Sequence, residues 1–192
     1  MKRIVSLLLA VICLLVSGSS FSEEESAWKG FRGIPWGASQ EEIISAEKTS
    51  PRDIHETSLY SGDFWTCLSY ENVRVSRHTA YLEYDLVNGS LVDGLYFFRT
   101  SVEKMDEDYD WLKEALTDLY GSPSDQGMEL VQGFFELGIL GNNHFIKSTV
   151  WSVGGTAIAL YINDGNELIV LYYGKDYHES HHEPDAGKYE GL

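Results

Sequence analysis

The chain has 192 residues, of which 43% are hydrophobic and 13% aromatic. This composition excludes a disordered chain and supplies enough apolar material for the core of one domain. The net charge of −16 argues against nucleic acid and anionic membrane surfaces as partners, because both are themselves negatively charged. A basic protein partner or divalent cations remain compatible with this charge.

Residues 1–22 have the features of a secretory signal. Lys2 and Arg3 precede an apolar run from Val5 to Val16, and mostly small polar residues continue to Ser22. The run is shorter than the roughly 20 residues of a membrane-spanning helix. We therefore expect an exported protein, periplasmic or secreted, with no transmembrane segment after cleavage. Cleavage removes two positive charges and no acid, which takes the net charge from −16 to −18.

Cys67 is the single cysteine beyond this segment, because Cys13 lies within it. No disulfide within the mature chain is then available. The aromatic and β-forming residues around Cys67 favour a buried thiol that packs as a small hydrophobic group over a reactive one.

A long amphipathic helix is predicted between Thr100 and Pro123. Thr100 and Glu103 have the spacing of a capping box, Gly121 is placed to end the helix, and Pro123 prevents its continuation. Apolar residues recur at steps of three and four, at Met105, Tyr109, Leu112, Leu116 and Leu119. Strand-like sequence lies on both sides, so we expect this helix to pack across a sheet.

A shorter helix is predicted from about Gln40 to Lys48, because Ser39 and Glu42 form a second capping box. The preceding residues 31–37 alternate large apolar side chains with glycine and proline. We predict that this stretch is an irregular apolar plug and that Trp36 packs on the core.

Strands account for most of the remaining pattern. Asn88-Gly89 and Asp164-Gly165 are hairpin turns, and Gly154-Gly155 is a third turn. The predicted strands are Phe64–Tyr70, the weaker Val73–Val75, Ala80–Val87, Leu91–Arg99, Phe145–Val153, Thr156–Asn163 and Glu167–Tyr173. Within Ala80–Val87, Leu82, Tyr84 and Leu86 share one face, and Glu83 and Asp85 share the other.

These elements predict a two-layer α+β fold, with helices packed on one face of one or two antiparallel sheets. We expect a single domain over residues 23–174. The likeness of the two hairpins also suggests a tandem helix-plus-sheet repeat, with halves 31–99 and 100–174. Residues 175–192 are an acidic, histidine-containing tail that we expect to be mobile.

Large rings occupy both faces of two predicted strands, around Leu95–Phe98 and Leu171–Tyr173. If helices cover one face, the rings of the other form a protein-contact surface. The candidate binding residues are Tyr96, Phe98, Tyr172 and Trp36. The alternative is that both faces are covered, by the plug or by a second copy of the chain.

The tail holds the densest group of metal-binding side chains. His178, His181 and His182, with neighbouring acids, suit zinc, copper or nickel. The alternative is a solvated tail, because no sequence feature buries such a site. No cofactor is expected. The chain has no recognised nucleophile motif, so we predict a non-enzymatic protein, with an unrecognised carboxylate hydrolase as the enzymatic alternative.

The order of elements resembles that of small exported bacterial proteins. Trp36-Gly37-Ala38-Ser39 leads into the short helix with Glu42-Ile43, and Leu119-Tyr120-Gly121-Ser122-Pro123 ends the long helix before three final strands. The pattern is similar to the β-lactamase-inhibitor-protein-like group and to outer-membrane assembly lipoproteins of the SmpA/OmlA type. The resemblance implies a non-enzymatic α+β scaffold that works through protein contacts in the cell envelope, with a homo-oligomer as one form of contact.

Overall fold

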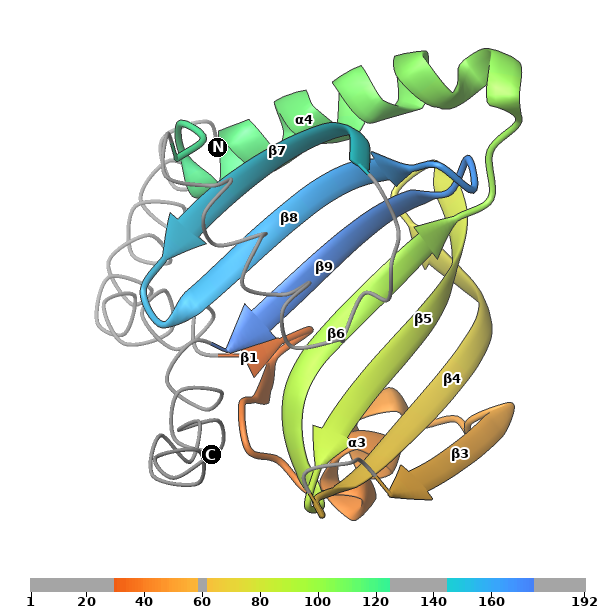
Figure 1. Ribbon diagram of the computed structural model, residues 1–192, viewed down its shortest axis with the longest axis vertical. Coiled ribbons are helices and arrows are strands. Elements are labelled where there is room, and N and C mark those ends of the chain that lie inside the picture. The colour runs from red at the N-terminus through yellow and green to blue at the C-terminus, as the bar shows by residue number, and fades with distance from the viewer. Residues whose placement is uncertain (1–29, 59–61, 125–144, 175–192) are drawn as a thin grey trace, which may run out of the picture.

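The computed structural model describes residues 30–58, 62–124 and 145–174 (Figure 1). The strands are β1 (Gly30–Phe31), β2 (Ile34–Pro35), β3 (Asp53–Ser58), β4 (Phe64–Val75), β5 (His78–Val87), β6 (Ser90–Phe98), β7 (Phe145–Val153), β8 (Thr156–Asn163) and β9 (Leu168–Gly174). The helices are α3 (Gln40–Glu47), the short 3₁₀ turn η1 (Val102–Lys104) and α4 (Met105–Tyr120). None of the helices in these ranges is long and apolar enough to cross a membrane.

Seven strands form one antiparallel sheet in the order β3-β4-β5-β6-β9-β8-β7, and β1 pairs with β2 in a small second sheet. The antiparallel α+β class predicted from the sequence is therefore confirmed. The predicted signal segment and the histidine tail lie outside the described residues.

The hairpin turns lie where the sequence predicts them. Asn88 and Gly89 both have positive φ, 51° and 80°, as a tight two-residue turn requires. The two runs predicted before Val75 form one strand, β4, because its register shifts between Tyr70 and Val73 without breaking the pairing. Strand β3 was not predicted, since its polar sequence is exposed along its whole length and lacks an apolar alternation.

The two helices differ in how well the sequence predicts their ends. Helix α3 has the predicted capping box between Ser39 and Glu42. The capping box predicted at Thr100 is wrong, because the Thr100 hydroxyl donates to Asp108 and the η1 turn precedes α4. The predicted apolar stripe is buried at Met105, Tyr109, Leu112 and Leu116, whereas Leu119 is 65% exposed.

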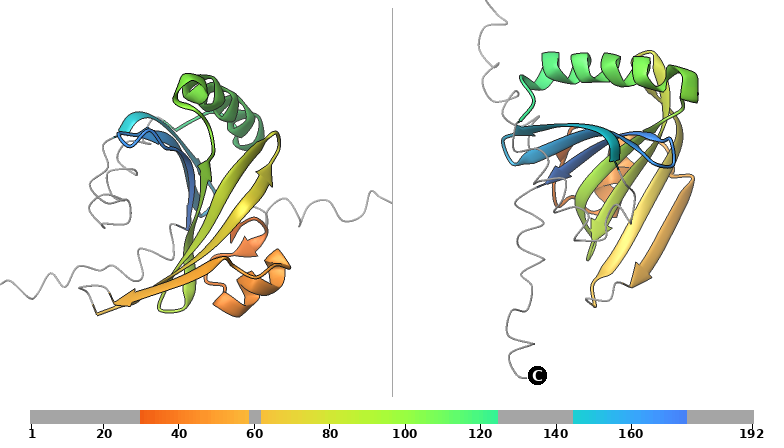
Figure 2. Two further views of the ribbon diagram at one scale, coloured as in Figure 1. Left: turned by 90° about the vertical axis from the view of Figure 1, so that its right-hand side faces the viewer. Right: turned by 45° about the horizontal axis from the view of Figure 1, so that its top comes forward.

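Alternation along the strands divides the sheet into two faces. Figure 2 shows α3 and α4 on the same side of the sheet. We call this side the helix face, and its buried strand residues are Leu68, Tyr70, Ala80, Leu82, Tyr84, Leu86, Leu91, Tyr96, Phe98, Trp151, Ile158, Leu160, Ile162, Leu168 and Val170. Hydrogen bonds that hold α4 there include Tyr109 with the Thr149 hydroxyl at 2.6 Å, and Trp151 Nε1 to the Gly121 carbonyl at 3.1 Å.

The opposite side carries a second buried cluster, and we call it the far face. Its apolar residues are Leu95, Phe97, Phe145, Val150, Ala157, Ala159, Tyr161, Ile169, Leu171 and Tyr173. The strand register also places Cys67, Glu83, Asp85 and Asp93 on this face.

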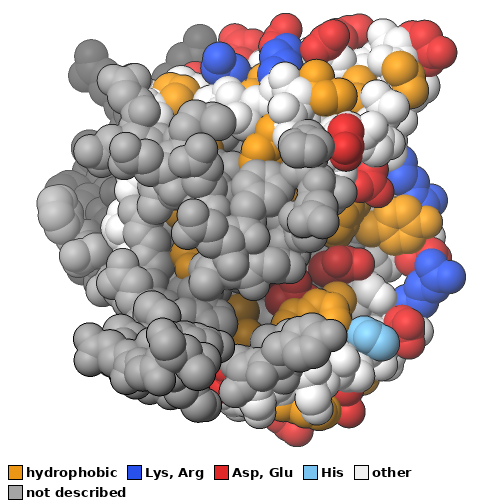
Figure 3. Space-filling view, in the orientation of Figure 1, with side chains coloured by type: hydrophobic (Ala, Val, Ile, Leu, Met, Phe, Trp, Pro, Cys, Tyr) orange, Lys and Arg blue, Asp and Glu red, His pale blue; other side chains and the backbone are white. Residues whose placement is uncertain are grey.

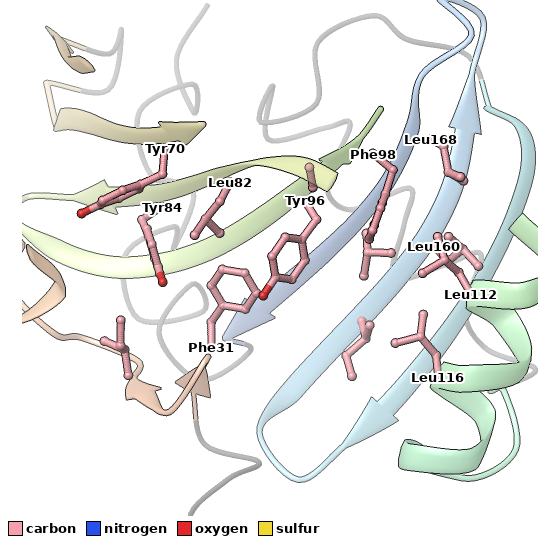
Figure 4. Close-up of a cluster of buried hydrophobic side chains, with 14 of the residues drawn as sticks. Phe31, Tyr70, Leu82, Tyr84, Tyr96, Phe98, Leu112, Leu116, Leu160 and Leu168 are labelled. Atoms are coloured by element: carbon pink, nitrogen blue, oxygen red, sulfur yellow. The ribbon is translucent and has the colours of Figure 1, made fainter. Parts of the chain in front are cut away.

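The predicted plug packs on the core as expected, but it is not irregular, because it contains the paired strands β1 and β2. The Phe31 ring lies 5.3 Å from Tyr84, 5.2 Å from Tyr96 and 4.9 Å from Tyr172, between ring centroids (Figure 4). Trp36 packs against the same core and donates from Nε1 to the Thr156 hydroxyl at 2.9 Å.

A charged group fastens this plug to the helix face. Arg32 donates to both carboxylate oxygens of Glu47, at 2.7 and 3.1 Å, and to the Tyr96 hydroxyl at 3.0 Å. The Tyr84 hydroxyl also donates to Glu47. The Glu47 side chain is only 10% exposed, so its charge depends on these donors.

Replacing Arg32 with alanine is expected to lower the free energy of unfolding by about 2 kcal/mol, because the partly buried Glu47 carboxylate loses its cationic partner. Urea denaturation measures the change. A second substitution, Glu47→Gln, removes the uncompensated charge and should recover part of the loss. Equal losses with and without Glu47→Gln would show that the Arg32 contact with Glu47 is not the cause.

Candidate functional site

The four residues predicted to bind a partner all lie on the helix face. Tyr96 and Phe98 are each 8% exposed, and Trp36 and Tyr172 pack against the same core. These side chains therefore do not form an open patch, and their role in binding stays a prediction.

The predicted metal-binding histidines, His178, His181 and His182, lie outside the described residues. Within residues 30–58, 62–124 and 145–174, no group of three or more His, Cys, Asp or Glu side chains is placed to hold a metal ion.

Two buried carboxylates face each other on the far face of the sheet. Asp85 of β5 is the cross-strand partner of Asp93 in β6, next to a register shift that leaves Val92 as an extra residue. Asp85 is 6% exposed and Asp93 is 1% exposed. Directly opposed residues on one face have their Cβ atoms about 5 Å apart, which brings the two carboxyl groups together.

The pair belongs to a row of polar side chains that crosses five strands. Successive cross-strand partners are His55 of β3, Cys67 of β4, Asp85, Asp93 and Tyr173 of β9. The antiparallel register alone creates this row, because cross-strand partners point to the same face.

The hydrogen bonds within the row are incomplete. The Cys67 thiol and the Asp93 carboxyl both donate to Asp85. The Oδ1 atoms of Asp85 and Asp93 are fully buried and have no hydrogen-bond partner among the described residues. An unpaired buried acceptor costs about 1–3 kcal/mol, and more when it is charged. The unpaired oxygens of this pair therefore lower the free energy of unfolding.

Burial shifts the ionisation of both carboxyl groups. It raises the pKa of Asp85 to about 7, against hydrogen bonds from Cys67 and Asp93 that lower it. Burial, together with the negative charge of Asp85, raises the pKa of Asp93 well above its ordinary value. Burial therefore favours the protonated form of both carboxyl groups, and two negative charges on the facing pair are disfavoured.

Neighbouring groups respond to the same environment. Burial, followed by the negative charge of Asp85, raises the pKa of the Cys67 thiol. Burial raises the pKa of Glu83, and the charge of Glu167 adds to the shift. Burial and the charge of Asp93 also raise the pKa of Tyr161. A thiol with a raised pKa is a poor nucleophile, so Cys67 is not activated for covalent catalysis.

The surroundings of the pair are apolar and aromatic. Leu95, Leu171, Tyr161 and Tyr173 belong to the buried cluster of the far face. Figure 3 shows acidic side chains lying among hydrophobic ones on this face, over β5 and β6. The two carboxyl groups therefore lie among apolar and aromatic side chains.

Sequence reasoning placed Glu83 and Asp85 on one face of their strand but missed Asp93. The available signal was the alternation in β6, where Asp93 shares a face with Leu95 and Phe97. Counting an unbroken register from the Asn88-Gly89 turn places Val92 opposite Asp85. The extra residue in β6 corrects the pairing, and no sequence pattern announces it.

Comparison of this chain with family models, curated proteins and solved structures gives no match. The site itself therefore provides the basis for a functional proposal.

Proposed function

We propose that this protein is an exported, non-enzymatic binding domain of the bacterial cell envelope, and that its ligand is held on the far face at Asp85 and Asp93. The observation that carries the proposal is the pair of facing carboxyl groups with unpaired, buried oxygens. Buried polar atoms normally have partners, so a pair of bare acceptors in an apolar setting fits a site that a ligand completes.

The export and envelope parts of the proposal rest on the signal-like residues 1–22 and on the resemblance to small envelope proteins. Two finer points of architecture belong to the same proposal. They are the two-layer arrangement, with helices packed on one face, and an origin by duplication of residues 31–99 and 100–174. The shared pattern of hairpin followed by ring-bearing strand supports the duplication.

A second candidate function is acid–base catalysis by the carboxylate pair. The pKa of about 7 for Asp85 favours it, because general acids and bases work best near the operating pH. Binding is the better-supported function because the raised pKa of Cys67 leaves the site without an activated nucleophile. A catalytic site would consume its ligand, whereas a binding site returns it unchanged.

A ligand search with matched variants tests the proposal. The melting temperature of the protein is measured with fractions of an envelope extract, separated into small molecules and proteins. A fraction that contains the ligand should raise the melting temperature of the wild type and not that of Asp93→Asn. Asp164→Asn removes an exposed carboxylate in the β8–β9 turn and should behave like the wild type.

Two results would contradict the proposal. One is a stabilising ligand that acts equally on the wild type and on Asp93→Asn, because binding would then lie elsewhere. The other is chemical conversion of the ligand during incubation with the wild type and not with Asp93→Asn, which would establish the catalytic alternative.

A further inference from the structure

The acceptors at the carboxylate pair specify the kind of ligand that completes it. Both Oδ1 atoms lack a donor among the described residues, and the two carboxyl groups come from adjacent strands. Other acids lie nearby: Glu83 raises the pKa of both carboxyl groups by its negative charge. A ligand that satisfies this site must bring hydrogen-bond donors and positive charge.

A metal ion is a poor match for these residues. Calcium takes six to eight oxygen ligands and magnesium needs an octahedral set, as general coordination rules state. The described part of the chain offers no group of three or more candidate ligands. The cluster of Leu95, Leu171, Tyr161 and Tyr173 instead offers apolar contact, which an organic ligand uses and a bare ion does not.

An ammonium group matches the pair better than a guanidinium group. The ammonium has three N–H donors that diverge from one atom, so a single group reaches two separate carboxylates. A guanidinium presents parallel donors in a planar fork, which matches both oxygens of one carboxylate. The two bare acceptors here belong to different residues, Asp85 and Asp93.

We propose that the far face binds a small organic ammonium ion, whose N–H groups donate to Asp85 and Asp93 and whose carbon chain packs against Tyr161 and Tyr173. This inference rests on the proposed binding function and names the ligand class. The ligand is small because both carboxyl groups are buried, so it must leave water to reach them.

Binding releases a proton from the pair. Burial and the facing negative charge disfavour two ionised carboxylates, so we expect the pair to share a proton when no cation is bound. The ammonium keeps its own protons and replaces this one, so the products are two carboxylates, the bound cation and one free proton. Among the described residues, the titratable groups near the pair include Cys67 from β4, Glu83 from β5, Tyr161 from β8 and Tyr173 from β9. Glu167 of the β8–β9 turn acts on Glu83 and Tyr161.

Calorimetric titration with n-butylammonium chloride tests the inference. We expect saturable binding to the wild type with release of about one proton, which is measured by repeating the titration in buffers of different ionisation enthalpy. Affinity should rise about tenfold for each pH unit below the pKa of the pair and level off above it. Butan-1-ol has the same carbon chain without the charge and should bind at least about tenfold more weakly.

Variants locate the binding. Asp93→Asn and Asp85→Asn should each weaken butylammonium binding at least about tenfold, whereas Asp164→Asn should leave it unchanged. Circular dichroism checks that each variant is folded. If neither pair variant folds, the pH dependence and the butanol comparison on the wild type still decide the matter.

Three results would overturn the inference: equal binding of butanol and butylammonium, affinity that does not change with pH, or unchanged affinity in folded Asp93→Asn. If butylammonium fails to bind and calcium chloride binds in a manner that requires Asp93, the ligand class is wrong and the binding function stands. If no fraction of the envelope extract distinguishes the wild type from Asp93→Asn either, both proposals fall.

Discussion

Replacing Gly94 with alanine is expected to destabilise the protein by about 3 kcal/mol, in the range for removing a buried phenylalanine from a core. A Cβ at this position would lie 1.9 Å from Cδ1 of Phe31. Gly94 belongs to the central strand β6, which is paired on both sides, so the backbone cannot retreat. The Phe31 ring cannot retreat either, because three tyrosine rings surround it.

Urea denaturation measures this loss, and a double-mutant cycle identifies its cause. In a Phe31→Ala background the added methyl group has room, so Gly94→Ala should cost much less there. An equal cost in both backgrounds would show that the strand backbone, and not the plug, requires glycine at this position. Gly174 is a second such position, because a Cβ there would lie 2.7 Å from the Trp36 ring.

The plug shows how far sequence reasoning reaches into this fold. Apolar residues interrupted by Gly33 and Pro35 predicted an irregular segment that packs on the core. The packing is confirmed, whereas the irregularity is wrong, because β1 and β2 pair there. The sequence did not predict what lies beneath it. From the sequence alone, Gly94 indicates a weak point in a strand. The close approach of the Phe31 ring explains why this position has no side chain.

Competition between local and tertiary hydrogen bonds explains the wrong helix start. Thr100 has the residue type and spacing of a cap, yet its hydroxyl is used by Asp108, which also lies near Arg77 and His78 at 3.6 and 3.7 Å. A cap prediction considers only neighbours in sequence. The two basic neighbours of Asp108 come from the β4–β5 turn and from β5, more than 20 residues earlier in the chain.

Register explains what the sequence left open about the two faces of the sheet. Alternation correctly grouped Tyr96 with Phe98 and Leu95 with Phe97, but it could not say which group the helices cover. An unbroken register would pair Asp85 with Val92. The extra residue in β6 shifts the register by one, so that Asp93 is the cross-strand partner of Asp85. A single residue in one strand therefore decides whether the site exists.

The same pair makes the stability of the protein depend on pH in an unusual direction. Most acids in folded proteins have a lowered pKa, so stability falls as acid is added. Asp85 and Asp93 both have raised pKa values, from an ordinary 3.8 to about 7 for Asp85 and well above 3.8 for Asp93. Between these limits the folded state binds more protons than the unfolded state, so the contribution of the pair to stability falls as pH rises from about 4 through 7.

Asp93→Asn is expected to be more stable than the wild type above pH 7, and this difference should shrink as the pH falls toward 4. At high pH the variant avoids a second buried charge, and at low pH the wild-type carboxyl group is already neutral. Urea denaturation from pH 4 to pH 8.5 measures the difference, and Asp164→Asn should follow the wild type throughout. A difference that is constant with pH would refute the raised pKa values.

A variant that gains stability and loses ligand binding would distinguish a pair kept for function from a pair that serves only the packing of the sheet. A site that costs stability when empty, and whose removal stabilises the fold, is maintained by what it does and not by what it contributes to the core. An Asp93→Asn protein that is both more stable at neutral pH and unable to bind butylammonium would show that the carboxylates serve a ligand. A variant that is less stable at every pH would assign the pair to the architecture of the sheet.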